Sequence, residues 1–189
     1  PQVIIRVQAD TRDWTIADYG ALGYHAGKLV GNRIPFFSGI NPGRDQLKAL
    51  GAAMAATGAV ALYHVDGVTP ETLNTPFDLG GLETIAVETD DVRGLFKEFP
   101  VDAVALGCPH CSPEELGTLA RLLAGRRVTK PLYIFASQGV IDANRNSVVA
   151  IEKSGAKVYA DTCMVVSPVM EQYRSIMVNS GKAFAYVPD

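Results

Sequence analysis

The residues best suited to chemistry in this sequence are three cysteines and a histidine. Cys108, Pro109, His110 and Cys111 form a C-x-x-C motif between an apolar run and a helix-like stretch, and Cys163 lies further along the chain. A turn from strand to helix directs backbone N–H groups and a helix dipole at the sulfurs, which favours the metal-binding and reactive thiolate form. The motif fits a thiol–disulfide oxidoreductase or a metal or iron–sulfur enzyme, and buried structural cysteines are the third alternative.

The elements that must position these residues follow an alternating pattern of short apolar runs and helix-like runs. Strands without polar alternation are typical of a parallel sheet covered by helices on both faces. The sequence therefore predicts an α/β fold with one mostly parallel central sheet. The predicted strands are residues 3–8, 33–37, 60–64, 84–88, 101–106, 132–136, 157–160 and 183–187. The predicted helices are residues 16–30, 45–57, 92–99, 113–124, 142–154 and 169–179.

Two helix boundaries have a clear chemical cause. Ser112 supplies a capping hydroxyl, Pro113 a preset φ and Glu115 the partner of a capping box, so a helix should begin here. Gly155 follows the predicted helix 142–154 and is expected to take the left-handed conformation common after a helix end. The segment 68–82, with two prolines and two glycines, is expected to be a long loop.

The three cysteines all follow predicted strands. Parallel sheets bind ligands outside the carboxyl ends of their strands, so Cys108, Cys111 and Cys163 should lie at one edge of the sheet. A thiol–disulfide enzyme using Cys108 and Cys111 needs only that pair, whereas a metal cluster needs thiolates from distant loops. The pattern therefore favours a metal centre. A closed zinc site is less well supported, because it requires four ligands and the sequence offers no evident fourth.

Composition narrows the classes of protein. The 189 residues, 48% hydrophobic and 20% charged, are sufficient for one core, and a single domain over residues 1–189 is expected. A net charge of −3 leaves no basic surface for nucleic acid, so a small molecule is the expected ligand. No apolar stretch reaches the ~20 residues of a membrane span, and we expect a cytoplasmic location. The first residue is Pro1 rather than Met, which suggests a segment of a larger protein.

A second candidate site consists of Asn179, Ser180, Gly181 and Lys182. Backbone N–H groups and a lysine ammonium could hold an anion there. The competing interpretation is the end of the predicted helix 169–179 with Gly181 as a left-handed cap, and the spacing by itself favours that cap.

Five motifs, taken together and in order, resemble the aconitase X family. They are DYGALGY at residues 18–24, GAVALYH at 58–64 followed by GVTP at 67–70, LGCPH at 106–110, DTC at 161–163, and NSGK at 179–182. The resemblance implies a three-layer α/β/α aconitase-like domain and a dehydratase whose iron–sulfur cluster, [2Fe-2S] or alternatively a single iron, acts as a Lewis acid. It also implies that the complete protein has further parts and a small swivelling domain or subunit that closes the site.

The resemblance also implies roles for particular residues. Cys108 and Cys163 look like iron ligands, with the family's third cysteine expected just beyond Asp189, and Cys111 is a less certain ligand. His110 looks like a catalytic residue beside the metal. The residues similar to substrate-binding positions are Asn179, Ser180, Lys182 and His64.

Two substrates are known in the family that this sequence resembles. One branch dehydrates cis-3-hydroxy-L-proline to pyrroline-2-carboxylate, and the other dehydrates mevalonate 5-phosphate. The form of the CPHCS segment, residues 108–112, inclines the interpretation toward the hydroxyproline branch. The thiol–disulfide oxidoreductase remains the alternative from another class.

Overall fold

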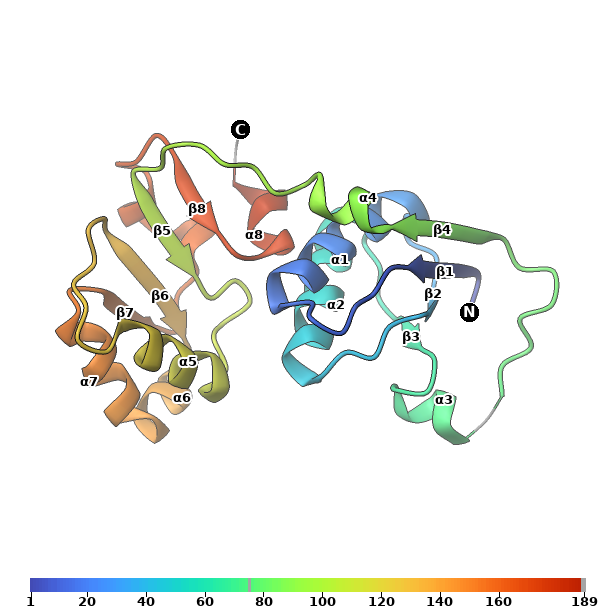
Figure 1. The fold of residues 1–189 in the computed structure, drawn as a ribbon, viewed down its shortest axis with the longest axis horizontal. Coiled ribbons are helices and arrows are strands. Elements are labelled where there is room, and N and C mark those ends of the chain that lie inside the picture. The colour runs from blue at the N-terminus through green and yellow to red at the C-terminus, as the bar shows by residue number, and fades with distance from the viewer. Residues whose placement is uncertain (75, 188–189) are drawn as a thin grey trace.

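The computed structural model describes residues 1–74 and 76–187, and it shows two four-stranded parallel sheets flanked by helices (Figure 1). The first sheet, in the order β3-β2-β1-β4, is formed by β1 (Val3–Gln8), β2 (Pro35–Ser38), β3 (His64–Val65) and β4 (Thr84–Glu88). The second sheet, in the order β7-β6-β5-β8, is formed by β5 (Ala103–Leu106), β6 (Leu132–Ala136), β7 (Lys157–Ala160) and β8 (Ile176–Val178). The α/β class predicted from the sequence is confirmed.

The helical segments follow the strands in chain order. They are α1 (Ile16–Val30), α2 (Arg44–Gly58), α3 (Pro70–Asn74), α4 (Thr89–Arg93), α5 (Pro113–Leu123), α6 (Gln138–Ala143), α7 (Arg145–Lys153), the 3₁₀ turns η1 (Met164–Val166) and η2 (Pro168–Met170), and α8 (Gly181–Tyr186). Among residues 1–74 and 76–187, no helix has the length and apolar character needed to cross a membrane.

The strands divide between two sheets, where the sequence predicted one central sheet. In β4, Val87 is buried but Thr84, Ala86 and Glu88 are exposed, so this strand forms an edge of the first sheet. The chain then continues to β5, which pairs with β6 and β8. Hydrophobic runs identify strands but not their partners, and the partners decide how many sheets form.

The first sheet is covered by α1 and α2, which pack closely together. Leu22 and Leu50 are fully buried with Ile5 of β1 in one core cluster. A Cβ on Gly23 would lie 2.3 Å from Leu50 O, and one on Gly27 would lie 2.1 Å from a side-chain oxygen of α2. The two glycines therefore allow α1 to approach the backbone of α2 more closely than larger residues would.

The second sheet has a separate core on each face. Leu116 of α5, Ile134 of β6 and Ile151 of α7 are buried together on one face. Phe135 and Met164 belong to the cluster on the other face. The alternation of Ile134 and Phe135 follows from the two-residue period of a strand, which directs successive side chains to opposite faces.

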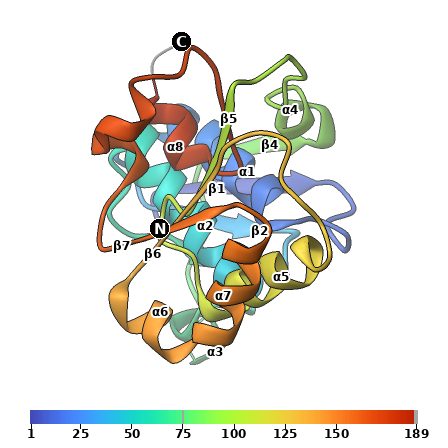
Figure 2. The ribbon, with the colours of Figure 1, turned by 90° about the vertical axis from the view of Figure 1, so that its left-hand side faces the viewer.

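The helix α8 joins the two halves of the molecule, because it belongs to the second half and packs against α1 and α2 of the first (Figures 1 and 2). A Cβ on Gly181 would lie 2.1 Å from Gly20 O. Backbone-to-backbone contact at this point therefore depends on two glycines.

The sequence-based prediction for the last segment is wrong. The predicted helix 169–179 is η2 followed by β8, and the predicted strand 183–187 is α8. Ile176, Met177 and Val178 pair with β5, and Ser180 accepts a hydrogen bond from Ala183 N as the N-cap of α8. Residues 179–182 therefore lie at a helix start, and the predicted left-handed C-cap at Gly181 is not present.

Other boundaries agree or shift locally. Ser112 and Glu115 form the predicted capping box at the start of α5, and Gly155 has the predicted positive φ of 95°. The predicted helix 142–154 is two helices that meet at Asn144, and α3 lies within the predicted loop 68–82. The strand predicted at 60–64 is limited to His64 and Val65, and the helix predicted at 92–99 begins and ends earlier, as α4.

Candidate metal centre

Cys108 and Cys163 lie together at the carboxyl ends of the second sheet. Cys108 follows β5 and Cys163 follows β7, and their thiols are near enough that Cys163 raises the pKa of Cys108. Both residues belong to the apolar cluster that includes Phe135 and Met164. The parallel arrangement of β5, β6 and β7 thus brings together two thiols that are distant in the sequence.

Burial keeps the Cys108 thiol protonated in the absence of a ligand. Burial and then the neighbouring Cys163 raise the pKa of Cys108 to about 11, although the Lys182 ammonium acts in the opposite direction. The sequence analysis expected the strand-to-helix turn to favour thiolate, and the structure corrects this expectation because burial favours the neutral thiol. A metal ion deprotonates a thiol that coordinates it, so this raised pKa is compatible with a ligand role.

Cys111 lies in a different environment from Cys108. It is 3% exposed and packs with Leu116 and Ile134 in the cluster under α5. Burial and the nearby Glu115 carboxylate raise the pKa of Cys111 to about 12. The two cysteines of the C-x-x-C motif therefore belong to separate clusters, and neither has the lowered pKa that activates a thiol for disulfide exchange.

His110 connects the two loops that carry Cys108 and Cys163. Its Nε2 lies 2.7 Å from Thr162 O, and because a carbonyl oxygen only accepts hydrogen bonds, Nε2 carries the proton. In the neutral imidazole, Nδ1 is then free to accept a proton or a hydrogen bond. His110 is thus held in a defined tautomer beside Cys163.

The segment 179–182 also reaches this group. Ser180 Oγ donates a hydrogen bond to Cys108 O and caps α8, and the Lys182 ammonium is near enough to lower the pKa of Cys108. Asn179 and Ser180 line an apolar cavity of about 330 Å³ between α1, β8 and α8. Of the four predicted substrate-binding residues, Ser180 and Lys182 are placed near Cys108 by the folding of β8 and α8, and Asn179 directly precedes them in the chain.

The fourth, His64, lies elsewhere. It is on β3 in the first sheet, with Nδ1 2.5 Å from Glu71 Oε1 and its ring 4.7 Å from that of Phe77. Figure 1 shows β3 on the side of α2 away from β5. The structure therefore does not bring His64 to the cysteines, because its strand belongs to the other sheet.

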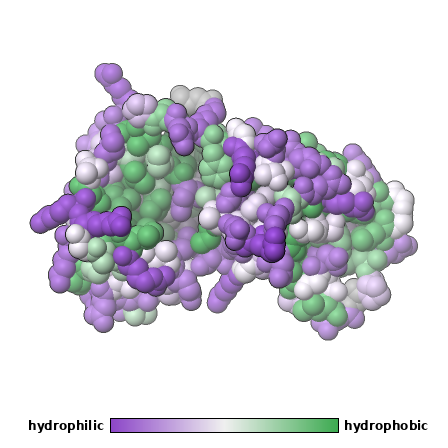
Figure 3. Space-filling model, in the orientation of Figure 1, coloured by the Kyte–Doolittle hydropathy of each residue, from purple (hydrophilic) through white to green (hydrophobic). Residues whose placement is uncertain are grey.

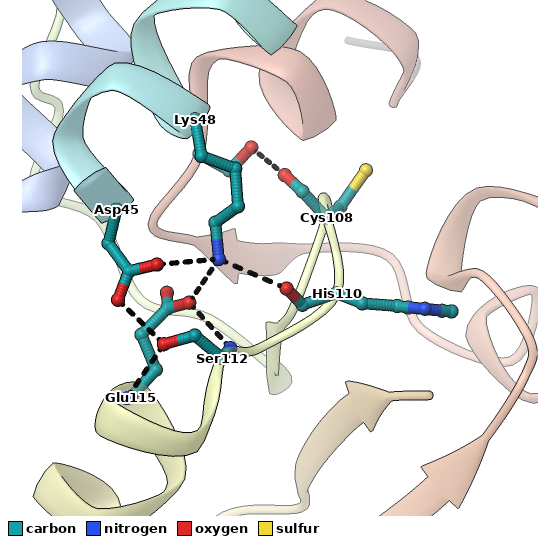
Figure 4. A network of polar contacts seen from close by, with 7 residues as sticks. Asp45, Lys48, Cys108, His110, Ser112 and Glu115 are labelled. Atoms are coloured by element: carbon teal, nitrogen blue, oxygen red, sulfur yellow. Dashed lines mark hydrogen bonds and ion pairs between the residues drawn. The ribbon is translucent and has the colours of Figure 1, made fainter. Parts of the chain in front are cut away.

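A polar network that the sequence analysis did not identify lies behind the site (Figure 4). Lys48 Nζ lies 2.5 Å from Glu115 Oε2, 3.3 Å from Asp45 Oδ1 and 3.1 Å from His110 O. Burial by itself would lower the pKa of Lys48, but the Glu115 and Asp45 carboxylates outweigh it and raise that pKa. The sequence signal was the i, i+3 spacing of Asp45 and Lys48, which is too common on helix surfaces to indicate a tertiary contact.

The donor set fits part of an iron or iron–sulfur site. Two thiols from separate loops are soft ligands of the kind that hold iron–sulfur clusters, with His110 beside them. Within the part of the chain that the structure describes, no three His, Cys, Asp or Glu side chains converge closely enough to hold a metal ion. Cys108 and Cys163 would supply two ligands of such a site.

A surface hollow adjoins the site on the half of the molecule that contains the second sheet. Figure 3 shows hydrophobic residues gathered in a hollow on that half. A cavity of about 740 Å³ is lined by residues of β8, η1, η2 and α8, including Val165 and Tyr186, and by Phe99 of the segment between α4 and β5. These three side chains are 53%, 38% and 50% exposed.

Two parallel sheets with two thiols at strand ends define an α/β protein with a candidate metal site, and comparison with known proteins identifies its family. The model of the aconitase X second domain matches residues 1–97, and that of the third domain matches residues 101–189. The chain belongs to the aconitase X family. The predicted resemblance is thereby confirmed.

Individual relatives agree with this family. The phosphomevalonate dehydratase large subunit of Methanosarcina mazei is 49% identical over 100% of this chain and 47% of its own length. The cis-3-hydroxy-L-proline dehydratase of Pseudomonas aeruginosa is 34% identical over 99% of this chain and 35% of its own length. The crystal structure of Thermococcus kodakaraensis aconitase X in its holo-form superposes with a TM-score of 0.87 at 43% identity, covering 98% of this chain and 50% of that one. The chain thus spans about half the length of these relatives or less.

Proposed function

We propose that this chain is the catalytic core of an aconitase X-type hydro-lyase, which removes water from a small hydroxy acid. The observation that carries the proposal is the meeting of Cys108 and Cys163 at the strand ends of the second sheet, with His110 between their loops. Two soft donors at this place suit an iron centre, as expected for the family. Cys111, which packs in a separate core cluster, is left out of the ligand set.

An iron–sulfur cluster, or alternatively a single iron, would supply a Lewis acid that polarises the C–O bond of the leaving hydroxyl. The residues of this chain would bind the substrate, hold or move a proton and position the loops of the site. The Lys182 ammonium would attract an anionic substrate to the site. The His110 ring, fixed by Thr162 O, would hold or move a proton at Nδ1. Ser180 donates a hydrogen bond to Cys108 O and caps α8. It would therefore keep residues 179–182 next to the loop that carries Cys108.

The choice of substrate follows the order of similarity. The large subunits of four phosphomevalonate dehydratases are 39–49% identical to this chain and a fifth is 32% identical, whereas two cis-3-hydroxy-L-proline dehydratases are 34% identical. We therefore favour mevalonate 5-phosphate as the substrate. The hydroxyproline reaction, toward which the sequence inclined, is the second candidate, supported by the Pseudomonas aeruginosa relative that matches 99% of this chain.

The partners proposed are the remaining parts of a longer large subunit and a small swivelling domain or subunit. The name "large subunit" of the archaeal relatives supports a second subunit. The apolar hollow lined by Phe99, Val165 and Tyr186 supports contact with further protein, because exposed apolar side chains gathered in one hollow are common at protein interfaces.

The test is a dehydration assay on the natural protein that contains this chain, with its small subunit and reconstituted with iron and sulfide. We expect turnover of mevalonate 5-phosphate and little or none of cis-3-hydroxy-L-proline. The reverse preference would assign the second candidate. Absence of both activities, together with insulin reduction that depends on Cys108 and Cys111, would replace the hydro-lyase by the thiol–disulfide alternative.

The cofactor type is tested in the same preparation. We propose a [2Fe-2S] cluster and expect equal amounts of iron and acid-labile sulfide with the visible absorption of a cluster. Iron without sulfide would instead assign the mononuclear alternative.

A further inference from the structure

Lys48 of α2 contacts the site loop, defined here as residues 107–112, although it belongs to the other half of the molecule. Its Nζ donates to His110 O at 3.1 Å and to Glu115 Oε2 at 2.5 Å, and Asp45 Oδ1 lies 3.3 Å away. An ammonium group has three N–H donors. Two hydrogen bonds and one ion pair thus hold the ammonium group, and one of the acceptors is a backbone group of the site loop.

The carboxylates around Lys48 hold the same loop at its end. Ser112 Oγ donates to Asp45 Oδ2 at 2.6 Å, and Ser112 N donates to Glu115 Oε2 at 2.9 Å. Glu115 Oε2 thus accepts from both Lys48 and Ser112, as Figure 4 shows. The network attaches the end of the site loop and the first turn of α5 to α2.

The attachment extends to the candidate ligands through His110. The His110 carbonyl accepts from Lys48, while its ring donates to Thr162 O, next to Cys163. The loop is therefore held from two sides, by α2 and by the loop after β7. The side chains of Lys48, Asp45 and Glu115 are only 30%, 20% and 13% exposed, so these bonds are shielded more than a surface ion pair would be.

We propose that Lys48 is a positioning residue of the candidate metal centre, which orients the site loop so that Cys108 and His110 face Cys163. The inference rests on the proposed function, because it assumes that Cys108 and Cys163 hold iron. Lys48 acts through the backbone of His110 and does not touch the metal or the substrate. A helix of the first half thereby sets the geometry of a site built on the second sheet.

The first test measures the rate at which the natural protein, loaded with iron, loses that iron to a chelator. Lys48→Met should raise this rate about 10-fold or more, because removing a group that orients a metal site typically weakens metal affinity about 10–100-fold. It should also change the visible and EPR spectra of the remaining iron. Arg33→Met is the matched control, because it breaks a 2.6 Å ion pair with Glu83 that does not involve the site loop. Arg33→Met should leave rate and spectra unchanged.

Lys48→Met also leaves the Asp45 and Glu115 carboxylates without their cation, which could by itself disturb folding and iron retention. A second variant therefore removes these charges as well, so that the loss of the Lys48 hydrogen bond to His110 O is tested separately. The triple variant Asp45→Asn, Lys48→Met, Glu115→Gln leaves no unpaired carboxylate, and its amides still accept hydrogen bonds from Ser112. If Lys48 positions the loop through His110 O, iron loss stays fast and the spectra stay altered in the triple variant.

Two outcomes would overturn the proposal: iron retention like wild type in Lys48→Met, or recovery of wild-type retention and spectra in the triple variant. The proposed function fails in a different way. A Cys108→Ala protein that keeps its iron would refute iron binding at this site, whatever the result for Lys48.

Discussion

At the residue scale, the three cysteines have different surroundings, which their spacing in the sequence does not indicate. Cys108 and Cys163 share one cluster, in which Cys163 raises the pKa of Cys108, whereas Cys111 packs under α5. We predict that Cys108→Ala and Cys163→Ala each abolish iron binding and dehydration, because too few thiolates remain to hold the metal. Cys111→Ala should retain iron and lose about 1 kcal/mol of stability through a small buried cavity. Iron analysis with a dehydratase assay distinguishes these results. An iron-free Cys111→Ala with an iron-loaded Cys108→Ala would reverse the ligand assignment.

At the element scale, the start of α5 combines a helix cap with a contact between the two halves. Ser112 Oγ accepts from Glu115 N and donates to Asp45 Oδ2. We predict that Ser112→Ala lowers the free energy of unfolding by about 2 kcal/mol, because it removes a cap and a hydrogen bond to a carboxylate. Ser137 caps α6 through Val140 N and makes no such second bond among the described residues, so Ser137→Ala should cost about 1 kcal/mol. Urea unfolding measures both, and an equal loss would show that the contact with Asp45 adds no stability.

At the scale of the whole molecule, the two halves meet where α8 lies against α1 and α2. We predict that Gly181→Ala destabilises the protein by about 1–3 kcal/mol, because its Cβ would overlap Gly20 O and force the helices apart. Gly139→Ala is the matched control, since a Cβ there meets nothing within 4 Å and alanine favours the helix α6. Thermal melting should show a lower midpoint for Gly181→Ala and an unchanged or higher one for Gly139→Ala. Equal midpoints would mean that the Gly20–Gly181 contact contributes nothing to the joining of the halves.

The amino-acid sequence by itself determined the local structure wherever one signal was strong. The strands β1, β4, β6 and β7 and the helix α1 were predicted with their observed bounds, because apolar runs and capping residues act within a few positions. The family motifs likewise pointed to Cys108, Cys163 and His110, which the structure brings together. Prediction was wrong for the last segment, where Ile176–Val178 is a strand only because β5 offers an edge to pair with.

Only the tertiary structure decided the features that depend on partners distant in the sequence. It divided the strands between two sheets, placed Cys111 in a core apart from Cys108, and separated His64 from the cysteines. It also brought Lys48 to His110, a contact between residues 62 positions apart. Local patterns encode the propensity of a segment and the direction of its apolar face. Other features depend on how distant segments pack: which strands pair, whether a thiol is buried, and which charged groups meet. Desolvation and hydrogen bonding at a residue are set by the groups that surround it in the folded protein.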